Sequence, residues 1–415
     1  MYLILAVTMG FALMLTEIAI GRKTGKSVIG AYTTMSKKFT PLGWIAAAVP
    51  ILILPYYCVI GGWVLKYMCA FIIGDGGVAA TVVTNASGES VSFFENFISM
   101  VKQPTVFFVI YVIINALVVL LGVKKGIEKI SKIFMPLLII LIIGIAAYII
   151  IFNDAADGLS YYLLPDFKDF TVSDGLKTVA AAMGQIFYSM SLAMGIMVTY
   201  GSYMRKEDSL ETSVRHIELF DTIIAFLAGL IIVPAVFIFS NGDPNALNAG
   251  PSLMFITLPK VFDSMPFGGF IGAAFFILVA IAALTSSISL METVVSIVSE
   301  KFKVSRKVSC LSVTVFSLVI GMLSVFGYSI WSGVEILGMQ ILDFFDFISN
   351  NILMPIVALL TCILVAFVVG TKYITDEVLL SQKKFRSEKL YKVMITVVCP
   401  ICMIIILITP FVTTL

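Results

Sequence analysis

The sequence predicts an all-α, polytopic membrane protein. Apolar residues make up 60% of its 415 positions, and charged residues only 13%. A soluble domain of this size does not need so much apolar surface, and so few charges would not keep its exterior hydrated. The apolar residues also form long runs, and an α-helix needs ~20 of them to cross the hydrocarbon of a bilayer. We therefore expect lipid, rather than water, to surround most of the chain.

About ten such runs can be distinguished, and together they predict a single transmembrane domain over residues 1–415. The expected spans lie near residues 2–20, 43–73, 104–123, 130–152, 176–203, 217–240, 267–299, 306–327, 342–370 and 390–414.

The distribution of charge predicts the topology. Most of the 27 Lys and Arg residues fall in every second connection, for example Arg22 and Lys26 after the first span and Lys301 and Lys303 after the seventh. By the positive-inside rule, these connections face the cytoplasm. We therefore expect a multi-pass protein of the plasma (inner) membrane, with the N-terminus, as given, and the C-terminus both outside.

The polar residues do not form a recognisable catalytic or metal centre. All six cysteines lie in predicted spans, where packing is the simplest role for a thiol. The single histidine, His216, stands at the start of a span with no cluster of metal ligands beside it. No serine triad, phosphate loop or pair of catalytic carboxylates can be assembled from the connections. We expect no enzyme, no resident cofactor and no nucleic-acid partner.

One predicted span is interrupted by polar residues. Residues 184–195 begin with Gly184, end with Gly195, and carry Ser189 and Ser191 inside a long apolar run. Serines two positions apart cannot share one face of a helix, whereas an unwound stretch directs both oxygens into one pocket. The alternative is a small-residue face for helix packing, where glycine and serine are common. We expect a broken helix.

A second polar cluster lies in the seventh predicted span, at residues 282–289. Thr285 and Ser286 belong to a group of hydroxyl side chains at a depth where Leu or Ala packs best. Hydroxyl and carbonyl oxygens together suit a small hard cation. Hydroxyls that donate to carbonyls of their own helix explain the cluster equally well. Our central hypothesis is that residues 189–191 and residues 285–287 face each other across a hydrated, cation-holding centre.

Acidic residues and helix-breaking residues mark further candidate positions. Asp221 lies near the start of an apolar span, and Asp343 and Asp346 lie at or near the outer end of another. An ionisable group at membrane depth indicates function, unless it is simply wet at the surface. Gly126 and Pro136 flank the entrance to the fourth span, where they predict either a hinge or an ordinary helix start.

These features occur in an order that resembles the neurotransmitter:sodium symporter family, and the resemblance to its bacterial members covers essentially the whole chain. The motifs that carry it are Glu17-Ile18-Ala19-Ile20-Gly21-Arg22, Tyr56-Tyr57, Gly126-x9-Pro136, Gly184-Gln185-Ile186-Phe187, Phe255-Ile256-Thr257-Leu258-Pro259 and Leu284-Thr285-Ser286-Ser287. The resemblance implies the LeuT fold, an inverted repeat with broken helices around a central site. The visible spans would then be family helices two to eleven, and the function would be sodium-coupled uptake by alternating access.

The resemblance also assigns roles to individual residues. It places the substrate at Ile53, Tyr57, Tyr188, Ser189, Ser191, Met194, Ser286 and Leu290. It places two sodium ions at Ser189, Asp221, Ala282, Thr285 and Ser286, with Asp221 as a fixed negative charge. It assigns the outer gate to Tyr57, Tyr188 and Asp346, and the cytoplasmic gate to Ser202, Tyr203 and Glu300. The hinge positions would be Gly126, Pro136, Gly184 and Gly195.

One departure separates the chain from the family pattern. Met1 aligns inside the second family helix, so the first helix, with its sodium-ligating carbonyls and outer-gate arginine, is not in this sequence. We therefore expect no coupled transport from this polypeptide alone. A start codon assigned too late, a split transporter and a degenerate protein all explain the departure.

Two classes of function remain. The first is sodium-driven symport of an amino acid, and the pliable side chain of Met194 favours a bulky hydrophobic or aromatic one. The second is a receptor-like, regulatory or structural membrane protein that binds without transporting, or one half of a split transporter. The expected partners are the amino acid, sodium ions and the lipid bilayer, and the sequence leaves a homodimer open.

Overall fold

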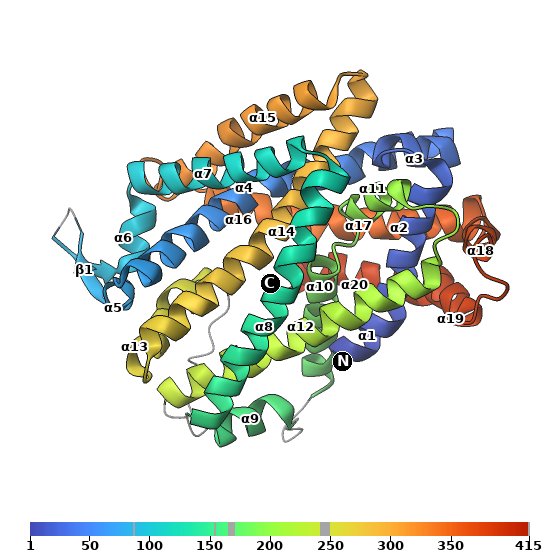
Figure 1. The fold of residues 1–415 in the computed structure, drawn as a ribbon. Coiled ribbons are helices and arrows are strands. Elements are labelled where there is room, and N and C mark those ends of the chain that lie inside the picture. The colour runs from blue at the N-terminus through green and yellow to red at the C-terminus, as the bar shows by residue number, and fades with distance from the viewer. Residues whose placement is uncertain (86–87, 153–154, 165–170, 241–249, 414–415) are drawn as a thin grey trace.

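The long helices follow the apolar runs of the sequence (Figure 1). The computed structural model describes residues 1–85, 88–152, 155–164, 171–240 and 250–413. Among these residues, nine helical segments are long and apolar enough to span a bilayer, and they lie at Tyr2–Thr24, Lys37–Ile73, Lys102–Leu120, Lys125–Ile151, Leu210–Phe237, Gly268–Phe302, Arg306–Gly327, Ile341–Val368 and Glu388–Ile408. The prediction of a polytopic helical membrane protein is confirmed.

Most spans contain one long helix, and the others join shorter helices through π-helical turns. The long helices are α4 (Thr40–Ile73), α7 (Lys102–Leu120), α8 (Glu128–Phe152), α12 (Leu210–Phe239), α14 (Gly268–Phe302) and α15 (Arg306–Gly327). The joined helices are α1 (Tyr2–Leu5) and α2 (Phe11–Thr24), α16 (Ile341–Phe347) and α17 (Met354–Ile363), and α19 (Glu388–Val393) and α20 (Cys399–Thr413). The π turns lie at Ala6–Gly10, Val123–Ile127, Leu253–Thr257, Ile348–Leu353, Leu364–Val368 and Met394–Val398.

Short elements cover the two ends of the bundle. One end carries α3 (Val28–Met35), a 3₁₀ turn at Lys37–Phe39, α18 (Lys372–Leu379) and α19. The other carries α5 (Gly76–Ala79), α6 (Phe93–Ser99), α13 (Leu258–Ser264) and an antiparallel hairpin of β1 (Val82–Thr84) and β2 (Ser90–Ser92). The helix α9 (Ala156–Leu163) packs against α12. We call the first end, with the connection between α14 and α15, the basic end.

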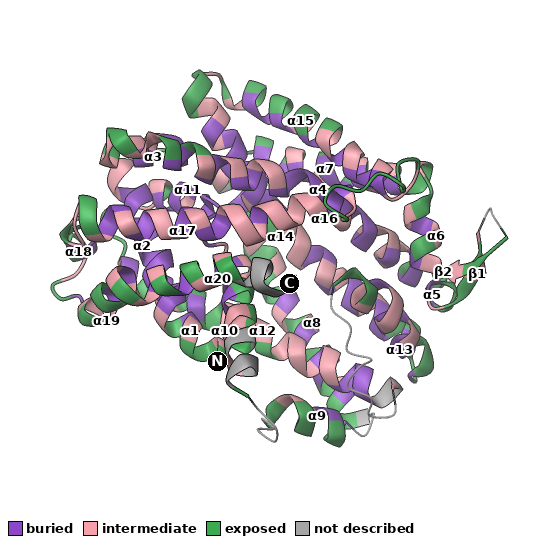
Figure 2. Ribbon diagram, turned by 180° about the vertical axis from the view of Figure 1, so that it is seen from behind, coloured by how far each residue is buried: buried purple, intermediate pink, exposed green. Residues whose placement is uncertain are grey.

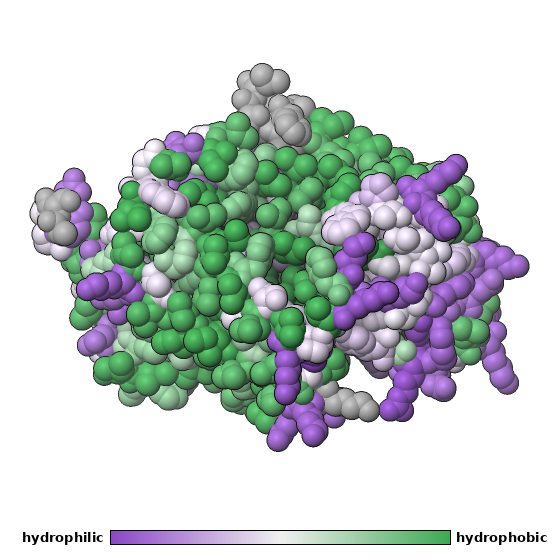
Figure 3. Space-filling view, turned by 90° about the horizontal axis from the view of Figure 1, so that it is seen from above, coloured by the Kyte–Doolittle hydropathy of each residue, from purple (hydrophilic) through white to green (hydrophobic). Residues whose placement is uncertain are grey.

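The surface has the character expected of a protein in lipid. Figure 3 shows hydrophobic side chains over the middle of the molecule and hydrophilic ones gathered toward its two ends, most densely at the basic end. In the first span, 72% of the apolar 18-residue stretch is buried, whereas in the α8 and α12 spans only 28% and 22% of it is buried. In Figure 2, buried residues concentrate along α2, α4 and α11 (Ile196–Tyr203). These helices form the core.

The fifth predicted span is broken, as the spacing of its serines predicts. Helix α10 (Val172–Ser189) stops, a turn follows, and α11 begins at Ile196. Ser191 and Ala193 have φ values of 53° and 59°, and Gly195 has 72°. This left-handed conformation cannot continue a right-handed helix, and glycine adopts it most easily. The break is therefore fixed by the backbone itself.

Helices α2 and α11 approach closely because each has a glycine at their crossing. A Cβ on Gly21 would lie 1.9 Å from the carbonyl oxygen of Val198, and one on Gly201 would lie 2.3 Å from that of Ile18. Small residues permit such backbone contact between helices in a membrane. We conclude that this crossing fixes the position of α11 behind the break.

Replacing Gly201 by alanine is expected to destabilise the protein by about 1–3 kcal/mol, because the added methyl group must push the two backbones apart. The measurement is the apparent Tm in detergent. Gly144→Ala is the matched control, since a Cβ on this α8 glycine meets nothing within 4 Å. Equal melting of both variants and the wild type would contradict the close-contact argument.

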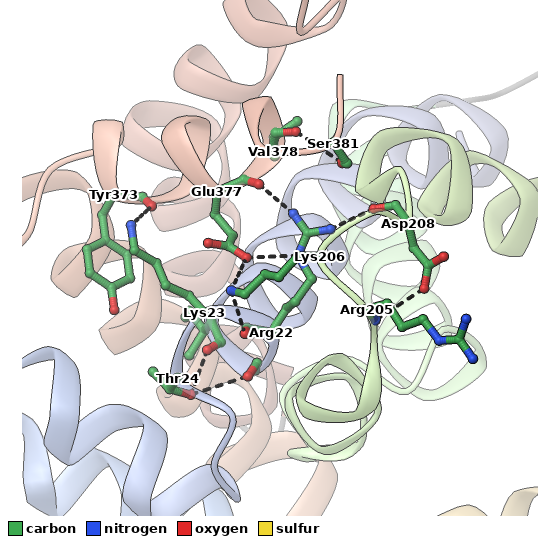
Figure 4. Close-up of polar contacts among 12 residues, drawn as sticks. Arg22, Lys23, Thr24, Arg205, Lys206, Asp208, Tyr373, Glu377, Val378 and Ser381 are labelled. Atoms are coloured by element: carbon green, nitrogen blue, oxygen red, sulfur yellow. Dashed lines mark hydrogen bonds and ion pairs between the residues drawn. The ribbon is translucent and has the colours of Figure 1, made fainter. Parts of the chain in front are cut away.

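A buried ion-pair cluster ties α2 to α18 at the basic end (Figure 4). The Arg22 guanidinium donates to Glu377 Oε1 at 2.8 Å and to the carbonyl oxygen of Asp208 at 2.6 Å. Lys206 donates to the same Glu377 oxygen at 2.9 Å and to the carbonyl oxygen of Arg22 at 3.1 Å. The side chains of Arg22 and Glu377 are 0% and 3% exposed. Each charge is therefore compensated by several partners.

Glu377→Gln is expected to destabilise the protein by about 3–5 kcal/mol, because it leaves the Arg22 charge buried without its carboxylate. The control is Glu388→Gln, which breaks the ion pair between Glu388 and Lys392. Their side chains are 40% and 47% exposed. The exposed pair is expected to contribute no more than about 1 kcal/mol. Thermal unfolding of the two variants side by side measures the difference, and similar losses would refute it.

Candidate functional site

The broken span and the hydroxyl cluster border one cavity. This cavity has a volume of about 450 Å³, and Ser191 lines it from the break while Thr285 and Ser286 line it from α14. Tyr200 on α11 and Ser289 on α14 complete this polar wall, and they hydrogen-bond to each other at 2.8 Å. The structure thus brings Ser191 next to Thr285 and Ser286, as the central hypothesis expects, but Ser189 does not line this cavity, so the expectation that both serines point into one pocket is wrong.

The opposite wall of the cavity is the entrance to the fourth span. Gly126 lies in the π turn at Val123–Ile127, and Ile127 and Glu128 line the cavity. A Cβ on Gly126 would lie 2.1 Å from the carbonyl oxygen of Val118, so the turn packs tightly on α7. Pro136 is inside α8, which continues past it. The entrance is therefore an irregular turn rather than an ordinary helix start, and its role as a hinge stays a prediction.

A second polar group forms where α10 ends. The Ser189 hydroxyl lies 2.8 and 2.7 Å from the two carboxylate oxygens of Asp221 on α12. The Tyr2 hydroxyl donates to Asp221 at 3.2 Å and lies 3.4 Å from Ser189 Oγ. The structure therefore brings Ser189 and Asp221 together and adds Tyr2, which sequence reasoning missed. No local pattern marks Tyr2, because it is one aromatic residue at the end of an apolar run.

The break itself is held by a buried acid on α2. Glu17 is 3% exposed, and one of its carboxylate oxygens accepts the backbone N–H of Ala193 at 2.7 Å. Its other oxygen has no hydrogen-bond partner among the described atoms. A helix supplies partners for its own N–H groups, but a left-handed turn in hydrocarbon does not. Glu17 therefore substitutes for a missing helical acceptor.

The hydroxyls on α14 do not all face the same way. Thr285 Oγ1 donates to the carbonyl oxygen of Ala282 at 2.9 Å, which is the intrahelical bonding that the sequence left open. Ser287 points to α7 instead, where it donates to Asn115 Oδ1 at 2.7 Å and contacts the Tyr111 hydroxyl at 2.9 Å. The prediction that residues 285–287 face one centre is therefore wrong for Ser287. Consecutive helical residues point about 100° apart, so one of them had to face α7.

Tyrosines from α4 and α10 meet the outer acid. Tyr56 donates to Asp346 Oδ1 at 3.0 Å, and its hydroxyl lies near Tyr188. Asn350 also donates to the Asp346 carboxylate, at 2.6 Å. The hydroxyl of the neighbouring Tyr57 lies near Ser286. Asp346 is therefore contacted by Tyr56, a residue that the sequence marked only as part of a motif. Tyr57 lies toward the hydroxyl cluster of α14 instead.

The three residues expected to form a cytoplasmic gate are not in contact with one another through hydrogen bonds. Tyr203 donates to Glu292 Oε1 at 2.8 Å, and Ser202 donates to the carbonyl oxygen of Thr199 in its own helix. Glu300 accepts the backbone N–H of Ser27, before α3. Their role as a cytoplasmic gate stays a prediction, and the structure adds a different acid, Glu292, as the partner of Tyr203.

Glu292 is part of a second buried ion pair that sequence reasoning missed. Its side chain is fully buried, and both of its oxygens accept hydrogen bonds from Arg306. Arg306 also donates to the carbonyl oxygen of Val119 on α7 at 2.7 Å. Fourteen positions separate Glu292 from Arg306, so no helical spacing connects them in the sequence. This pair holds α14, α15 and α7 together at the basic end.

The remaining expected substrate residues lie in the core. Ile53 on α4, Met194 in the break and Leu290 on α14 are 0%, 3% and 3% exposed. Gly195 is the N-cap of α11 in the left-handed conformation. Gly184 is inside α10, and a Cβ there would meet nothing within 4 Å. The structure shows a reason for glycine at position 195 and none at position 184.

Comparison with known proteins shows what this architecture belongs to. The model of the sodium:neurotransmitter symporter family matches residues 82–414. An uncharacterized sodium-dependent transporter of Haemophilus influenzae is 32% identical over 89% of this chain and 80% of its own length. Human sodium- and chloride-dependent GABA transporter 2 is 22% identical over 91% of this chain and 68% of its own length.

A solved structure shows the same fold. The crystal structure of MhsT in complex with L-phenylalanine superimposes with a TM-score of 0.85 and 32% sequence identity, over 98% of this chain and 90% of that one. The family resemblance of the motifs is therefore confirmed, and so is the expectation that the protein is not an enzyme. The chain belongs to the sodium:neurotransmitter symporter family of membrane transporters and has the LeuT fold.

Proposed function

We propose that this protein binds sodium and an amino acid with a bulky hydrophobic or aromatic side chain, as part of a transporter that couples their movement across the membrane. The observation that carries the proposal is the shared cavity of Ser191, Thr285 and Ser286. Irregular backbone at membrane depth is tolerated where it lines such a cavity, and transporters bind their ligands at these breaks. Hydroxyl and carbonyl oxygens supply the ligands that a small hard cation requires.

We assign one sodium site to Ala282, Thr285 and Ser286. The Thr285 hydroxyl oxygen and the Ala282 carbonyl oxygen are 2.9 Å apart, so both can contact a single ion once the hydroxyl proton rotates away. Ser286 is exposed and adds a third oxygen next in the chain. Because all three oxygens belong to α14, further ligands of the sodium ion must come from outside that helix.

We assign the other sodium site to the region of Ser189 and Asp221. The serine hydroxyl lies within 2.8 Å of both Asp221 carboxylate oxygens, and donating its proton to them leaves its lone pairs free for a cation. The carboxylate also supplies negative charge close to the ion, and Coulomb attraction at short range is strong away from bulk water. Asp221 is therefore expected to raise sodium affinity without contacting the substrate.

The substrate assignment rests on chemistry and on one structural neighbour. A zwitterion needs a hydroxyl donor for its carboxylate, which we assign to Tyr57, and an acceptor for its ammonium group, which we assign to Ser191. MhsT, with the same fold, holds L-phenylalanine. Ile53, Met194 and Leu290 are buried and apolar, which suits a side chain of that kind. We therefore propose Phe, Trp, Tyr or Leu as the substrate class.

The Lys/Arg-rich basic end is proposed to face the cytoplasm, by the positive-inside rule. The gating roles of Tyr188 and Asp346 at one end and Tyr203 at the other belong to the same proposal. Tyr203 is supported by its hydrogen bond to Glu292 across α11 and α14.

Thr285→Ala is expected to weaken sodium binding about tenfold, because it removes one oxygen from a site with few ligands. The measurement is sodium-dependent binding of tritiated phenylalanine to the purified chain, titrated with sodium. Thr314→Ala is the matched control, since Thr314 also donates to its own helix, at 2.7 Å, but stands on α15 away from the cavity. Equal sodium dependence in the wild type and both variants would contradict the assignment.

Asp221→Asn is expected to weaken sodium binding at least tenfold, because the amide keeps the shape of the side chain but removes its charge. The control is Asp376→Asn, at an exposed position on α18. Calorimetry with sodium chloride, and with choline chloride as the reference salt, measures the affinity. The assignment fails if Asp221→Asn binds sodium as tightly as the wild type.

A second candidate function is binding without transport. The observation in its favour is that the Thr285 and Ser189 hydroxyls already have partners within the chain. Uptake of tritiated phenylalanine into proteoliposomes under a sodium gradient separates the two functions. Gradient-dependent accumulation supports symport, whereas sodium-dependent binding without accumulation supports the second function.

A further inference from the structure

Two cavities flank the end of α14, and they have opposite chemistry. The first, of about 460 Å³, is an apolar groove in the outer surface, lined by Ile51 of α4, Val294, Val298 and Phe302 of α14, and Val308 and Phe316 of α15. Val294, Val298 and Phe302 are four residues apart and therefore share one helix face. The groove opens where the surface faces hydrocarbon.

The second cavity, of about 660 Å³, is polar and lies at the basic end. Its lining includes the three basic residues Lys26, Lys37 and Lys301, together with Thr33 and Ser36. It also includes Glu300, whose carboxylate accepts the backbone N–H of Ser27 and is thereby committed to holding the start of α3. Three positive groups against one negative group leave the cavity with an excess of positive charge.

Lys301 lines the polar cavity and contacts Trp44 on α4, the helix that also contributes Ile51 to the groove. The Lys301 ammonium lies 4.8 Å from the centre of the Trp44 ring, in a cation–π contact. Trp44 stands seven positions before Ile51 on α4, so both point to the same side, with Ile51 about 10 Å farther along the helix. Trp44 is 47% exposed, and tryptophan is enriched at the level of lipid headgroups. The groove therefore descends from the headgroup level into the hydrocarbon.

We propose that these cavities together bind one anionic phospholipid of the leaflet at the basic end. One acyl chain lies in the groove, and the phosphate with its headgroup lies among Lys26, Lys37 and Lys301. Charge complementarity selects the headgroup, because the ammonium group of a zwitterionic lipid would be placed next to three lysines. A free phosphate ion would leave the apolar groove unused, which is why we assign a lipid. Basic pockets between helices at this level of a membrane bind anionic headgroups.

The experiment measures lipid retention. The purified full chain is reconstituted into phosphatidylcholine vesicles containing phosphatidylglycerol with the same acyl chains, extracted again, and its bound lipids are quantified by mass spectrometry. We expect the wild type to retain phosphatidylglycerol in preference to phosphatidylcholine. Lys37→Gln and Lys301→Gln are each expected to lower this preference about fivefold. Val298→Trp, which fills the groove, is expected to reduce retention of phosphatidylglycerol.

Matched controls separate the site from general surface effects. Lys383→Gln with Lys384→Gln removes two exposed charges elsewhere at the basic end, and Val319→Trp adds the same bulk to an α15 position that is 60% exposed. Neither control is expected to change retention. Equal retention of both lipids by the wild type would overturn the proposal. So would displacement of phosphatidylglycerol by inorganic phosphate with no effect of Val298→Trp, since that result identifies a free-anion site.

Discussion

The need to satisfy backbone hydrogen bonds inside hydrocarbon is the constraint on which the rest of this structure depends. Between Ser189 and Ile196 the chain leaves the helix, so the N–H group of Ala193, unlike those of Met190 and Leu192, donates to a side chain instead of a carbonyl of α10. Glu17 meets part of this need by accepting the Ala193 N–H at 2.7 Å. A buried acid is itself costly. Glu17 can therefore accept this hydrogen bond only if α2 is held firmly against the break.

The close crossing of α2 and α11 holds α2 in this position. Gly21 lies one helical turn beyond Glu17, and its backbone touches that of Val198, just past the break. The Arg22 cluster then anchors the end of α2 to α18 and to Lys206, which follows α11. Three kinds of contact therefore follow one another along α2: the buried acid, the close packing against α11 and the ion pairs. The cavity beside Ser191 can stay polar because this framework holds it open.

Local sequence patterns predicted the parts of the structure that depend on local chemistry. The lengths of apolar runs gave the spans, and the spacing of Ser189 and Ser191 gave the break, because both follow from helix geometry. Pairings between distant residues could not be predicted in this way. Tyr2 and Asp221 are 219 positions apart, and Arg22 and Glu377 are 355 apart. The face of Ser287 was mistaken for the same reason, since only its packing against Asn115 decides it.

The contacts at the basic end differ in the free energy that is needed to break them. Arg22 and Glu377 join α2 to α18 through buried charges whose separation costs about 3–5 kcal/mol. Arg306, whose side chain is 34% exposed, joins α15 to the buried Glu292 of α14 through a second ion pair. Helix α11 is joined to α14 by two hydroxyl bonds, from Tyr203 to Glu292 and from Tyr200 to Ser289, and no ion pair crosses between these helices among the described residues. Such a bond contributes about 1–3 kcal/mol when its acceptor is charged and about 1 kcal/mol when it is neutral. The seam between α11 and α14 is therefore the easier one to open. The cavity of Ser191, Tyr200 and Thr285 lies along that seam, so opening it connects the proposed cation site to the basic end while both ion-pair clusters stay intact.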